Sequence, residues 1–413
     1  MEGKHIAVFT PLAAGHVYPA LGVCSELVSR GHRVTYPTDE RFVPRIRAAG
    51  AEPVEFKVPE IRHAEKVVRY PSPGDSRYWR AFTSIYCPML MTTAAATVAE
   101  VEGFYATNPP DVILYEWFSF GGRILARQLS CPAIQMCAHF AHRDSLMRVN
   151  GVGTNPEPML AFARMLDSFM STYGFEERGH LWHVEAMNIF LIPREFQYDA
   201  DSFDDRFTFV GATHNRKPRA AVWKNRAARG KPLLLISENT ASCDDRFVRV
   251  CIEAFADSQY HVVFSKGLNS PEVPAAQVPG NFEINREAFN CDILPFASVM
   301  VCQGGMGTSL EALYHGVPVV AVPSEPFNSE VAYRVAELGL GLNVPERGMT
   351  ARALGEAVDT AAFDEALRTR VRRMQDSLRN NPGAEAAADA IEAFLARRLN
   401  RDSFQPWSRT EYS

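Results

Sequence analysis

The sequence predicts an α/β protein built from two doubly wound domains, each with a parallel sheet covered by helices. Short, continuous apolar runs alternate with segments of helical periodicity, a pattern typical of parallel strands that are buried on both faces. This alternation occurs twice, before and after a basic, poorly periodic segment at 213–232 that we interpret as a linker. A length of 413 residues also suits two domains.

In the first half, HIAVFTP (5–11) predicts a strand, which is followed by a glycine-containing loop and a helical pattern closed by Gly31. HRVTYPT (32–38) predicts the second strand, and a further helix precedes Gly50. The series continues with the predicted strands DVILYEW (111–117), PAIQMCAHF (132–140) and NIFLIP (188–193). Repeated strand–helix units of this kind indicate a parallel sheet.

The second half repeats this order. Its five predicted strands are LLLISEN (233–239), YHVVFSK (260–266), FEIN (282–285), SVMVCQG (298–304) and VPVVAVP (317–323). Helical patterns lie around 244–256, 291–297, 307–315 and 328–338, and the chain is helix-rich from Thr350 to Leu399. In such sheets, ligands bind beyond the carboxyl ends of the strands, so functional residues are expected in the loops that directly follow strands.

Composition excludes several classes of protein. Hydrophobic residues make up 46% and charged residues 22%, values that fit a globular protein and not a disordered, collagen-like or coiled-coil chain. Lys and Arg number 43 against 48 Asp and Glu, and the formal net charge is −5. Because no sustained basic block is present, nucleic acid is not an expected partner.

The eight cysteines form no C-x-x-C pair and no zinc-finger spacing, and most lie in apolar segments, so we expect reduced core thiols. The start MEGKHIAVFTP enters a strand-like run without an apolar signal region, and we expect neither a cleaved signal peptide nor a membrane-spanning segment. The predicted location is the cytoplasm. The oligomeric state is open, with a homodimer as one possibility.

The loop PLAAGHVYPA (11–20) places His16 at or near the start of the first predicted helix. A helix N-terminus disfavours the imidazolium and keeps a proton-accepting nitrogen available, so His16 is a candidate general base. The alternative is a structural histidine hydrogen-bonded in a helix cap. The loop is neither G-x-G-x-x-G nor a Walker A sequence, so neither a Rossmann dinucleotide site nor a P-loop is predicted.

A carboxylate beside His16 would fix its tautomer and stabilise the imidazolium formed during proton abstraction. Asp111 and Glu116 flank the predicted strand DVILYEW. Glu116 lies at the carboxyl end of that strand, where a ligand is expected, whereas Asp111 lies at the opposite edge. Glu116 is therefore the candidate partner, with an ordinary loop carboxylate as the alternative.

The segment SVMVCQGGMGTSLEALYHGVPVVAVP (298–323) predicts a strand, a glycine-rich turn and a helix. Its glycines let the backbone approach a ligand closely, and the first N–H groups of the helix suit a diphosphate. A carboxylate one turn further on could reach a ribose diol. The alternative is that the glycines serve tight strand–helix packing. The residues concerned are Gly304, Gly305, Gly307, Thr308, Ser309 and Glu311.

Other clusters carry less information. HFAH (139–142) and HLWH (180–183) each hold two histidines, but the local sequence supplies no further metal ligands, so no metal is predicted. Aromatic residues at helical spacing are most simply explained by core packing. The alternative is that they form an apolar wall of the acceptor-binding site. The candidate acceptor-binding residues are Tyr78, Phe82, Tyr86 and His139.

Three segments together resemble the GT-B glycosyltransferases of family 1, particularly the bacterial enzymes that glycosylate macrolides and other natural products. They are HIAVFTPLAAGHVYPALGVCSELVSRGHRVTY (5–36), GGMGTSLEALYHGVPVVAVP (304–323) and AYRVAELGLGLNV (332–344). The resemblance implies two Rossmann-like domains facing a central cleft. An acceptor domain (1–214) and a nucleotide-sugar domain (215–390) would be followed by a C-terminal helix and tail (391–413) that return toward the first domain.

The resemblance also implies a reaction that inverts the anomeric carbon by direct displacement. His16 falls on the family's catalytic histidine, and Glu116 falls where the family usually has an aspartate. No metal or other cofactor is implied, because helix-terminal donors stabilise the departing diphosphate.

The donor motifs depart from the family pattern. Gln303 stands where the family has a diphosphate-contacting histidine, and SENTAS (237–242), which begins at Ser237, replaces a Ser-Gly-Ser loop. REAFN (286–290) replaces the tryptophan and glutamine motif that stacks on the base, a role that Phe289 could take.

Phe327 and Asn328 replace the Asp-Gln pair that holds sugar hydroxyls. This exchange removes hydrogen bonds and adds apolar surface, which favours a deoxy sugar. We therefore expect sugar transfer from a dTDP or UDP donor to a hydroxyl of a hydrophobic natural product. The alternatives are an auxiliary subunit whose donor site has decayed, and a sugar-nucleotide epimerase or hydrolase on the same scaffold.

Overall fold

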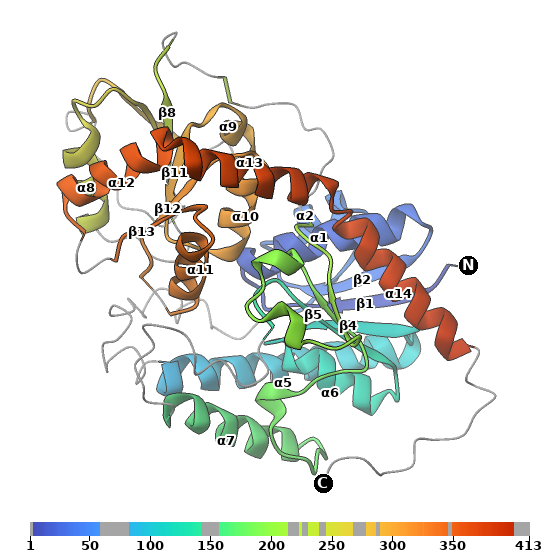
Figure 1. Ribbon diagram of the computed structural model, residues 1–413. Coiled ribbons are helices and arrows are strands. Elements are labelled where there is room, and N and C mark those ends of the chain that lie inside the picture. Colours follow the sequence, from blue (N-terminus) through green and yellow to red (C-terminus); the bar gives the residue numbers. More distant parts are fainter. Residues whose placement is uncertain are drawn as a thin grey trace.

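The protein folds into two α/β domains, each built around a parallel sheet (Figure 1). This computed structural model describes residues 3–57, 82–141, 157–213, 223–224, 230–238, 245–266, 278–285, 290–324, 326–345 and 349–399. The α/β class and the parallel sheets predicted from the sequence are confirmed. Most of the expected linker, 214–222 and 225–229, lies outside the described residues.

The N-terminal sheet has seven strands in the order β3-β2-β1-β4-β5-β6-β7, all parallel. The strands are β1 (His5–Phe9), β2 (Arg33–Thr38), β3 (Glu52–Glu55), β4 (Val112–Glu116), β5 (Ala133–Cys137), β6 (Asn188–Phe190) and β7 (Phe207–Phe209). The sequence did not predict β3 and β7. Both are short strands, one at each edge of the sheet. Each is defined by its pairing with one neighbouring strand and lacks the long apolar run that marks a strand in the sequence.

Helices cover this sheet on both faces. They are α1 (Ala14–Ser29), α2 (Val43–Ala48), α5 (Cys87–Thr107), α6 (Phe120–Gln128) and α7 (Glu157–Ser171), and the π-helical turn Phe82–Tyr86 leads into α5. The helix α1 follows β1 after four residues, as the sequence predicts. This short connection places the start of α1 at the carboxyl edge of the sheet.

The C-terminal sheet has six parallel strands in the order β10-β9-β8-β11-β12-β13. They are β8 (Leu233–Ser237), β9 (His261–Ser265), β10 (Phe282–Asn285), β11 (Val299–Cys302), β12 (Val319–Ala321) and β13 (Gly341–Asn343). The sequence predicted the first five of these strands and missed the short edge strand β13.

The C-terminal domain carries the helices α8 (Asp245–Phe255), α9 (Asn290–Ile293), α10 (Met306–Tyr314), α11 (Pro326–Glu337), α12 (Ala351–Phe363) and α13 (Glu365–Asn380). The last helix, α14 (Ala384–Leu399), leaves this domain and lies along the N-terminal domain beside α1 (Figure 1). Its buried face packs into the core around β1 and β2. The returning helix therefore starts before residue 391, the boundary that the resemblance implied.

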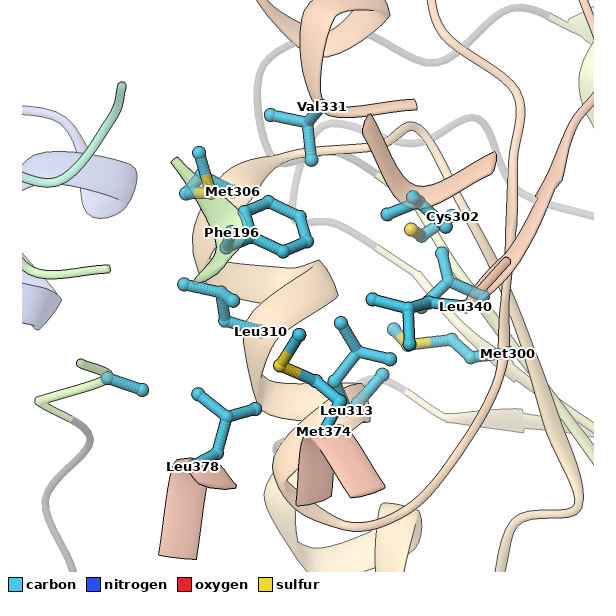
Figure 2. Packing of buried hydrophobic residues seen from close by; sticks show 14 of the residues in the cluster. Phe196, Met300, Cys302, Met306, Leu310, Leu313, Val331, Leu340, Met374 and Leu378 are labelled. Atoms are coloured by element: carbon cyan, nitrogen blue, oxygen red, sulfur yellow. The ribbon is translucent and has the colours of Figure 1, made fainter. Parts of the chain in front are cut away.

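One hydrophobic cluster is continuous across the two domains. Phe196, from the N-terminal half, lies beside Met306 and Leu310 of α10 (Figure 2). Arg334 of α11 donates to the carbonyl oxygens of Glu195, Phe196 and Gln197 at 2.9 to 3.0 Å. These contacts fix α10 and α11 against the N-terminal domain.

The sequence predicts no membrane-spanning segment, and one described helix nevertheless passes the length and composition test for such a segment. Residues 81–99 carry no charge, and the helix Phe82–Thr107 is long and apolar enough, by length and composition, to cross a membrane. The helix packs against α6 and α7, and its buried face contributes to a hydrophobic cluster. The seven described cysteines are all free thiols, and five of them are buried; Cys243 lies outside the described residues.

Candidate active site

The carboxyl edges of the two sheets face each other through residues of the loops that follow the strands. Glu116 ends β4, and His139 lies two residues beyond β5. On the other side, Gln303 follows β11, and α11 begins shortly after β12. His139 contacts Phe327 of α11, so loops from both domains meet at this point.

His16 lies in the first turn of α1, as the sequence predicts. The backbone N–H groups of His16 and Val17 both donate to the carbonyl of Ala13, which closes the first turn. Ala13 at the N-cap makes no side-chain cap bond, and His16 itself does not cap the helix. The structure therefore contradicts the alternative in which His16 is a structural histidine that caps the helix.

Glu116 faces His16 from the end of the neighbouring strand. Nδ1 of His16 lies 3.2 Å from Oε1 of Glu116, and the carboxylate is 3% exposed. Its second oxygen, Oε2, accepts a hydrogen bond from the backbone N–H of Phe118 at 2.9 Å. This bond fixes the orientation of the carboxylate. Asp111 accepts from the backbone of His5 at the opposite edge of the sheet, as expected.

The environment of His16 acts on its pKa in two opposing ways. Burial lowers the pKa, but the negative charge of Glu116 and a hydrogen bond to it outweigh burial and raise the pKa above the usual 6.5. The N-terminus of α1 acts in the other direction, because it disfavours the imidazolium. With Nδ1 turned to the carboxylate, Nε2 is the nitrogen that can accept a proton from a ligand.

His139 joins the two domains. Its Nε2 lies 3.3 Å from the carbonyl oxygen of Phe327, and its Nδ1 lies 3.8 Å from Oε2 of Glu330. Burial lowers the pKa of His139 to about 4, with a smaller lowering from His16. The ring is therefore neutral at physiological pH. The sequence placed His139 on the acceptor side; the structure adds its contacts to the donor-side helix α11.

Phe327 packs against rings of the N-terminal domain. Its ring centroid lies 6.3 Å from that of Phe82, 6.0 Å from Phe118 and 5.9 Å from His139. We call these four residues the interdomain aromatic cluster. The cluster places an apolar donor-side residue directly against the acceptor domain.

The aromatic residues predicted to bind the acceptor have different outcomes. Phe82 is 1% exposed and lies in the core, which agrees with the packing alternative and not with a ring that lines a site. Tyr86 is half-buried and stacks on Phe82 at 5.5 Å, so its role in acceptor binding stays a prediction. Tyr78 lies outside the described residues.

The glycines of the donor turn differ in what they contact. Gly304 has a φ of +76°, and a Cβ there would lie 2.9 Å from the carbonyl oxygen of Asn328, so packing and backbone conformation both require glycine. A Cβ on Gly305 would approach no atom closer than 3.9 Å, and one on Gly307 would meet nothing within 4 Å. These two glycines are thus not explained by packing against the described residues, which favours the ligand interpretation.

The helix α10 starts at this turn. Its first helical hydrogen bond runs from the N–H of Ser309 to the carbonyl of Gly305, and the preceding N–H groups lie ahead of the helical ladder. Thr308 is half-buried at this end. Ser309 needs correction: its side chain is fully buried beside the thiol of Cys302, so its hydroxyl is not presented to a ligand.

The remaining donor-side residues lie along the same edge. Gln303 is 8% exposed, and Ser237 at the end of β8 accepts a hydrogen bond from the Asn290 side chain at 2.8 Å. Burial, and then the charge of Asp292, raise the pKa of Glu311 to about 7. Glu311 thus lies in a setting where a hydrogen-bond donor such as a sugar hydroxyl would favour its ionised form. Phe289 lies outside the described residues, as do residues 239–242 of SENTAS.

The described histidines of the two pairs contact other groups. His180 is buried against the ring of Phe175, and His183 pairs with Glu185 at 3.2 Å. His142 lies outside the described residues. Across the described ranges, no three His, Cys, Asp or Glu side chains are placed to hold a metal ion.

Sequence reasoning missed two features of this site. Phe118, whose N–H holds Glu116, follows it by two residues in the same loop, and this position after a strand was the available signal. Glu330 occurs three residues after Phe327, on the face of α11 that meets the N-terminal domain. No sequence signal marks that face, because it is defined by the other domain.

Comparison with protein families matches residues 257–394 to the C-terminal domain of erythromycin biosynthesis protein CIII-like proteins. Among curated proteins, NDP-glycosyltransferase YjiC of Bacillus subtilis is 32% identical over 96% of this chain and 99% of its own. Demethyllactenocin mycarosyltransferase of Streptomyces fradiae is 29% identical over 95% of this chain and 87% of its own.

Solved structures agree with these relatives. The calicheamicin glycosyltransferase CalG4 superposes with a TM-score of 0.79, at 32% identity, over 96% of this chain and 99% of its own. The glycosyltransferase of kitacinnamycin gives a TM-score of 0.80 at 27% identity, over 96% and 100% of the two chains. The similarity therefore extends over both domains.

Proposed function

The chain belongs to the family 1 glycosyltransferases of the GT-B fold, of the natural-product type, and we propose that it transfers a sugar, with inversion, from a dTDP or UDP donor to a hydroxyl of a hydrophobic natural product. The pairing of His16 with the buried Glu116 is the single observation that carries this proposal. It supplies a general base at the edge where the two domains meet.

In the proposed reaction, Nε2 of His16 takes the proton of the acceptor hydroxyl, and the oxygen attacks the anomeric carbon. The bond from that carbon to the diphosphate oxygen breaks, and the electron pair leaves with the nucleoside diphosphate. Glu116 stabilises the imidazolium that forms. Because attack and departure occur on opposite faces of one carbon, the product has the inverted anomeric configuration.

On the donor side, the turn at 304–308 and the N-terminus of α10 receive the diphosphate. The open space at Gly305 and Gly307 supports this placement. Glu311 binds a hydroxyl of the nucleoside sugar. The donor is a co-substrate, and neither a metal nor a further cofactor enters the proposed reaction.

Phe327 supports a deoxy sugar as the transferred group. Its ring packs in the interdomain aromatic cluster and offers no polar atom to a sugar hydroxyl. A sugar hydroxyl placed there would lose its hydrogen bonds to water without replacement. The same apolar surroundings suit a hydrophobic acceptor.

Turnover with a panel of donors tests the proposal. We expect a kcat/KM about 5- to 150-fold higher for a dTDP-deoxy sugar than for UDP-glucose, since one unpaired buried hydroxyl costs on the order of 1–3 kcal/mol. The anomeric proton coupling of the product, measured by NMR, should show inversion. Calorimetric titration with dTDP and UDP separates the alternative: an auxiliary subunit with a decayed donor site binds neither nucleotide, and that result would contradict the proposal.

Replacing Glu116 by glutamine should change both the rate and its pH dependence. The acidic limb of the wild-type profile should lie above pH 6.5, because the raised pKa of His16 leaves it protonated below that point. In Glu116→Gln, burial remains but the negative charge is lost, so the limb moves to lower pH. The plateau should fall about 10- to 100-fold, because the imidazolium loses its stabilising charge. The profile of kcat/KM between pH 5 and 9 measures both effects.

Asp111→Asn is the matched control, since Asp111 is a carboxylate at the other edge, next to the same strand. Its limb should stay at the wild-type pH. An acidic limb that stays in place in Glu116→Gln would contradict the role of Glu116.

A further inference from the structure

Within the described residues, the chain passes from one domain to the other at two places, and both lie near the helix that carries His16. The first is the linker, which begins at Thr213 after β7, and the second is the connection between α13 and α14 (Figure 1). The two crossings touch, because a Cβ on Gly211 would lie 2.6 Å from the side chain of Asn381, the C-cap of α13. The helix α10, which begins at the donor turn, also lies against α1.

The linker lies directly on α1. The buried hydroxyl of Thr213 donates to the carbonyl oxygen of Pro19 at 2.7 Å. Gly22 is one turn further along the same face of the helix, and a Cβ there would lie 1.8 Å from the carbonyl oxygen of Thr213. Gly22 lies inside a regular helix, so the close approach of the linker, and not an unusual backbone conformation, requires glycine here.

Pro19 connects this contact to the catalytic residue. A proline inside a helix loosens the turn that precedes it, because it has no N–H for the carbonyl four residues earlier, which is that of Gly15. His16 lies in that turn. The hydrogen bond from Thr213 therefore holds α1 at the point where its first turn is least fixed by the helix itself.

The other end of α1 is held by α14. Arg30, the C-cap of α1, donates to Asp389 at 2.6 Å and to Glu392 at 2.8 Å. Nδ1 of His32 accepts from the backbone N–H of Lys4 at 3.1 Å, so its proton is on Nε2, which donates to Glu392 at 3.0 Å. These contacts fix α1 in the N-terminal domain, so a wider separation at Gly22 has to displace the linker.

We propose that Gly22 and Thr213 are positioning residues for sugar transfer, because the contact between the linker and α1 fixes the donor domain relative to His16. Relative motion of two linked domains is the default unless contacts restrict it. Ala212 carries a displacement of Thr213 to the donor side, since it is buried in the hydrophobic cluster that is continuous across the two domains. The proposal rests on the proposed function, in which His16 and the donor turn at 304–308 act on one carbon atom.

Gly22→Ala tests the close approach. Because the clash is with backbone atoms, and real Cβ contacts essentially never fall under 3.0 Å, the linker has to move outward by about 1 Å. A misplacement of about 1 Å can cost on the order of 100-fold in rate, so kcat should fall about 10- to 100-fold. The acidic limb of the pH profile should stay in place, because the pair of His16 and Glu116 lies within one domain. The dissociation constant for dTDP or UDP should stay within about 2-fold, because the donor turn lies within the other.

Thr213→Val tests the hydrogen bond without a clash, and it decides the question if Gly22→Ala does not fold. Valine has the shape of threonine but cannot donate to Pro19, and the loss of one neutral hydrogen bond should lower kcat about 5-fold. Thr213→Ser retains the hydroxyl and should restore kcat to within about 2-fold of the wild type. Gly103→Ala is the control and should match the wild type, because a Cβ on this glycine of α5 would meet nothing within 4 Å.

A second readout needs no turnover. Amide hydrogen exchange, measured by mass spectrometry, should be faster in Gly22→Ala and Thr213→Val for the segment 195–198 and for α10, which meet between the domains. Exchange in β1 should stay at the wild-type rate, because the core of the N-terminal domain is not altered.

Wild-type kcat and wild-type exchange in the folded variants would overturn the proposal. A displaced acidic limb, or weaker nucleotide binding, would overturn it as well, because the damage would then lie within one domain and not between the two. A wild type that transfers no sugar, with the expected changes in exchange in the variants, would count against the proposed function and leave the positioning contact supported.

Discussion

His16→Ala should lower turnover by about 10³-fold, the middle of the range attributed to a positioned general base. The acceptor hydroxyl ionises far above neutral pH, so attack on the anomeric carbon needs a group that removes the proton as the bond forms. His16 is the residue that the structure places for this, with Nδ1 held by Glu116 and Nε2 left to accept. Alanine leaves the helix in place and removes the acceptor nitrogen.

The fold of this variant should be retained, because His16 lies in the first turn of α1 and makes no cap bond, and alanine is a good helix former. Nucleotide binding, measured by calorimetry, should be unchanged, since the donor turn belongs to the other domain. His16→Gln keeps a polar side chain of similar length and should be equally inactive. His5→Ala, at the opposite edge of the same sheet, should retain turnover within a few-fold. Turnover near the wild-type rate in His16→Ala would refute the base assignment.

The pairing of His16 with Glu116 could be predicted from the sequence because it depends on one rule. Adjacent parallel strands end at the same edge, and β1 and β4 are adjacent, so the first residues after β1 and the last residue of β4 come together. The position of Glu116 at the end of its strand already favours it over Asp111 as the partner of His16, and the resemblance to the family supports the same assignment. The opposite placement of Asp111 follows from the same rule.

Contacts between the domains could not be predicted in this way. The approach of Phe327 to Phe82 and Phe118, and that of Glu330 to His139, depends on how two separately folded sheets are oriented. Local periodicity predicts which face of α11 is apolar, but not what that face meets. Burial of a single polar residue is similarly hidden: Ser309 follows Thr308 by one position, and the turn of the helix carries its hydroxyl into the core.

The glycine-rich turn illustrates another limit, because a sequence shows where glycines are but not why. Gly304 and Gly305 are adjacent glycines that look alike in the sequence. A side chain at Gly304 would clash with the carbonyl oxygen of Asn328, whereas one at Gly305 would enter open space. The structure thus shows that Gly304 is needed for folding, whereas the absence of a side chain at Gly305 leaves space for a ligand. That difference leads to the second large effect we expect.

Gly305→Val should strongly weaken donor binding without unfolding the protein. Gly305 is the N-cap of α10 with φ −62° and ψ 139°, a conformation that valine adopts readily. The added side chain would occupy the space in front of the first N–H groups of the helix, where the diphosphate is proposed to bind. Losing two hydrogen bonds to a charged group, each of roughly 1.5–3 kcal/mol, should raise the dissociation constant for dTDP or UDP at least about 100-fold. Calorimetric titration measures this, and the melting temperature should stay within about 2 °C of the wild type.

Gly304→Ala is the matched contrast, because it should act on stability first. Its φ of +76° and the approach to Asn328 together strain any residue with a Cβ, at a cost of about 1–3 kcal/mol in the free energy of unfolding. Denaturant unfolding of the two variants should therefore separate them: a lower midpoint for Gly304→Ala and an unchanged one for Gly305→Val. If Gly305→Val binds nucleotide as tightly as the wild type, the diphosphate does not lie at this turn. If it unfolds like Gly304→Ala, both glycines serve packing, and the turn loses its main support as a ligand site.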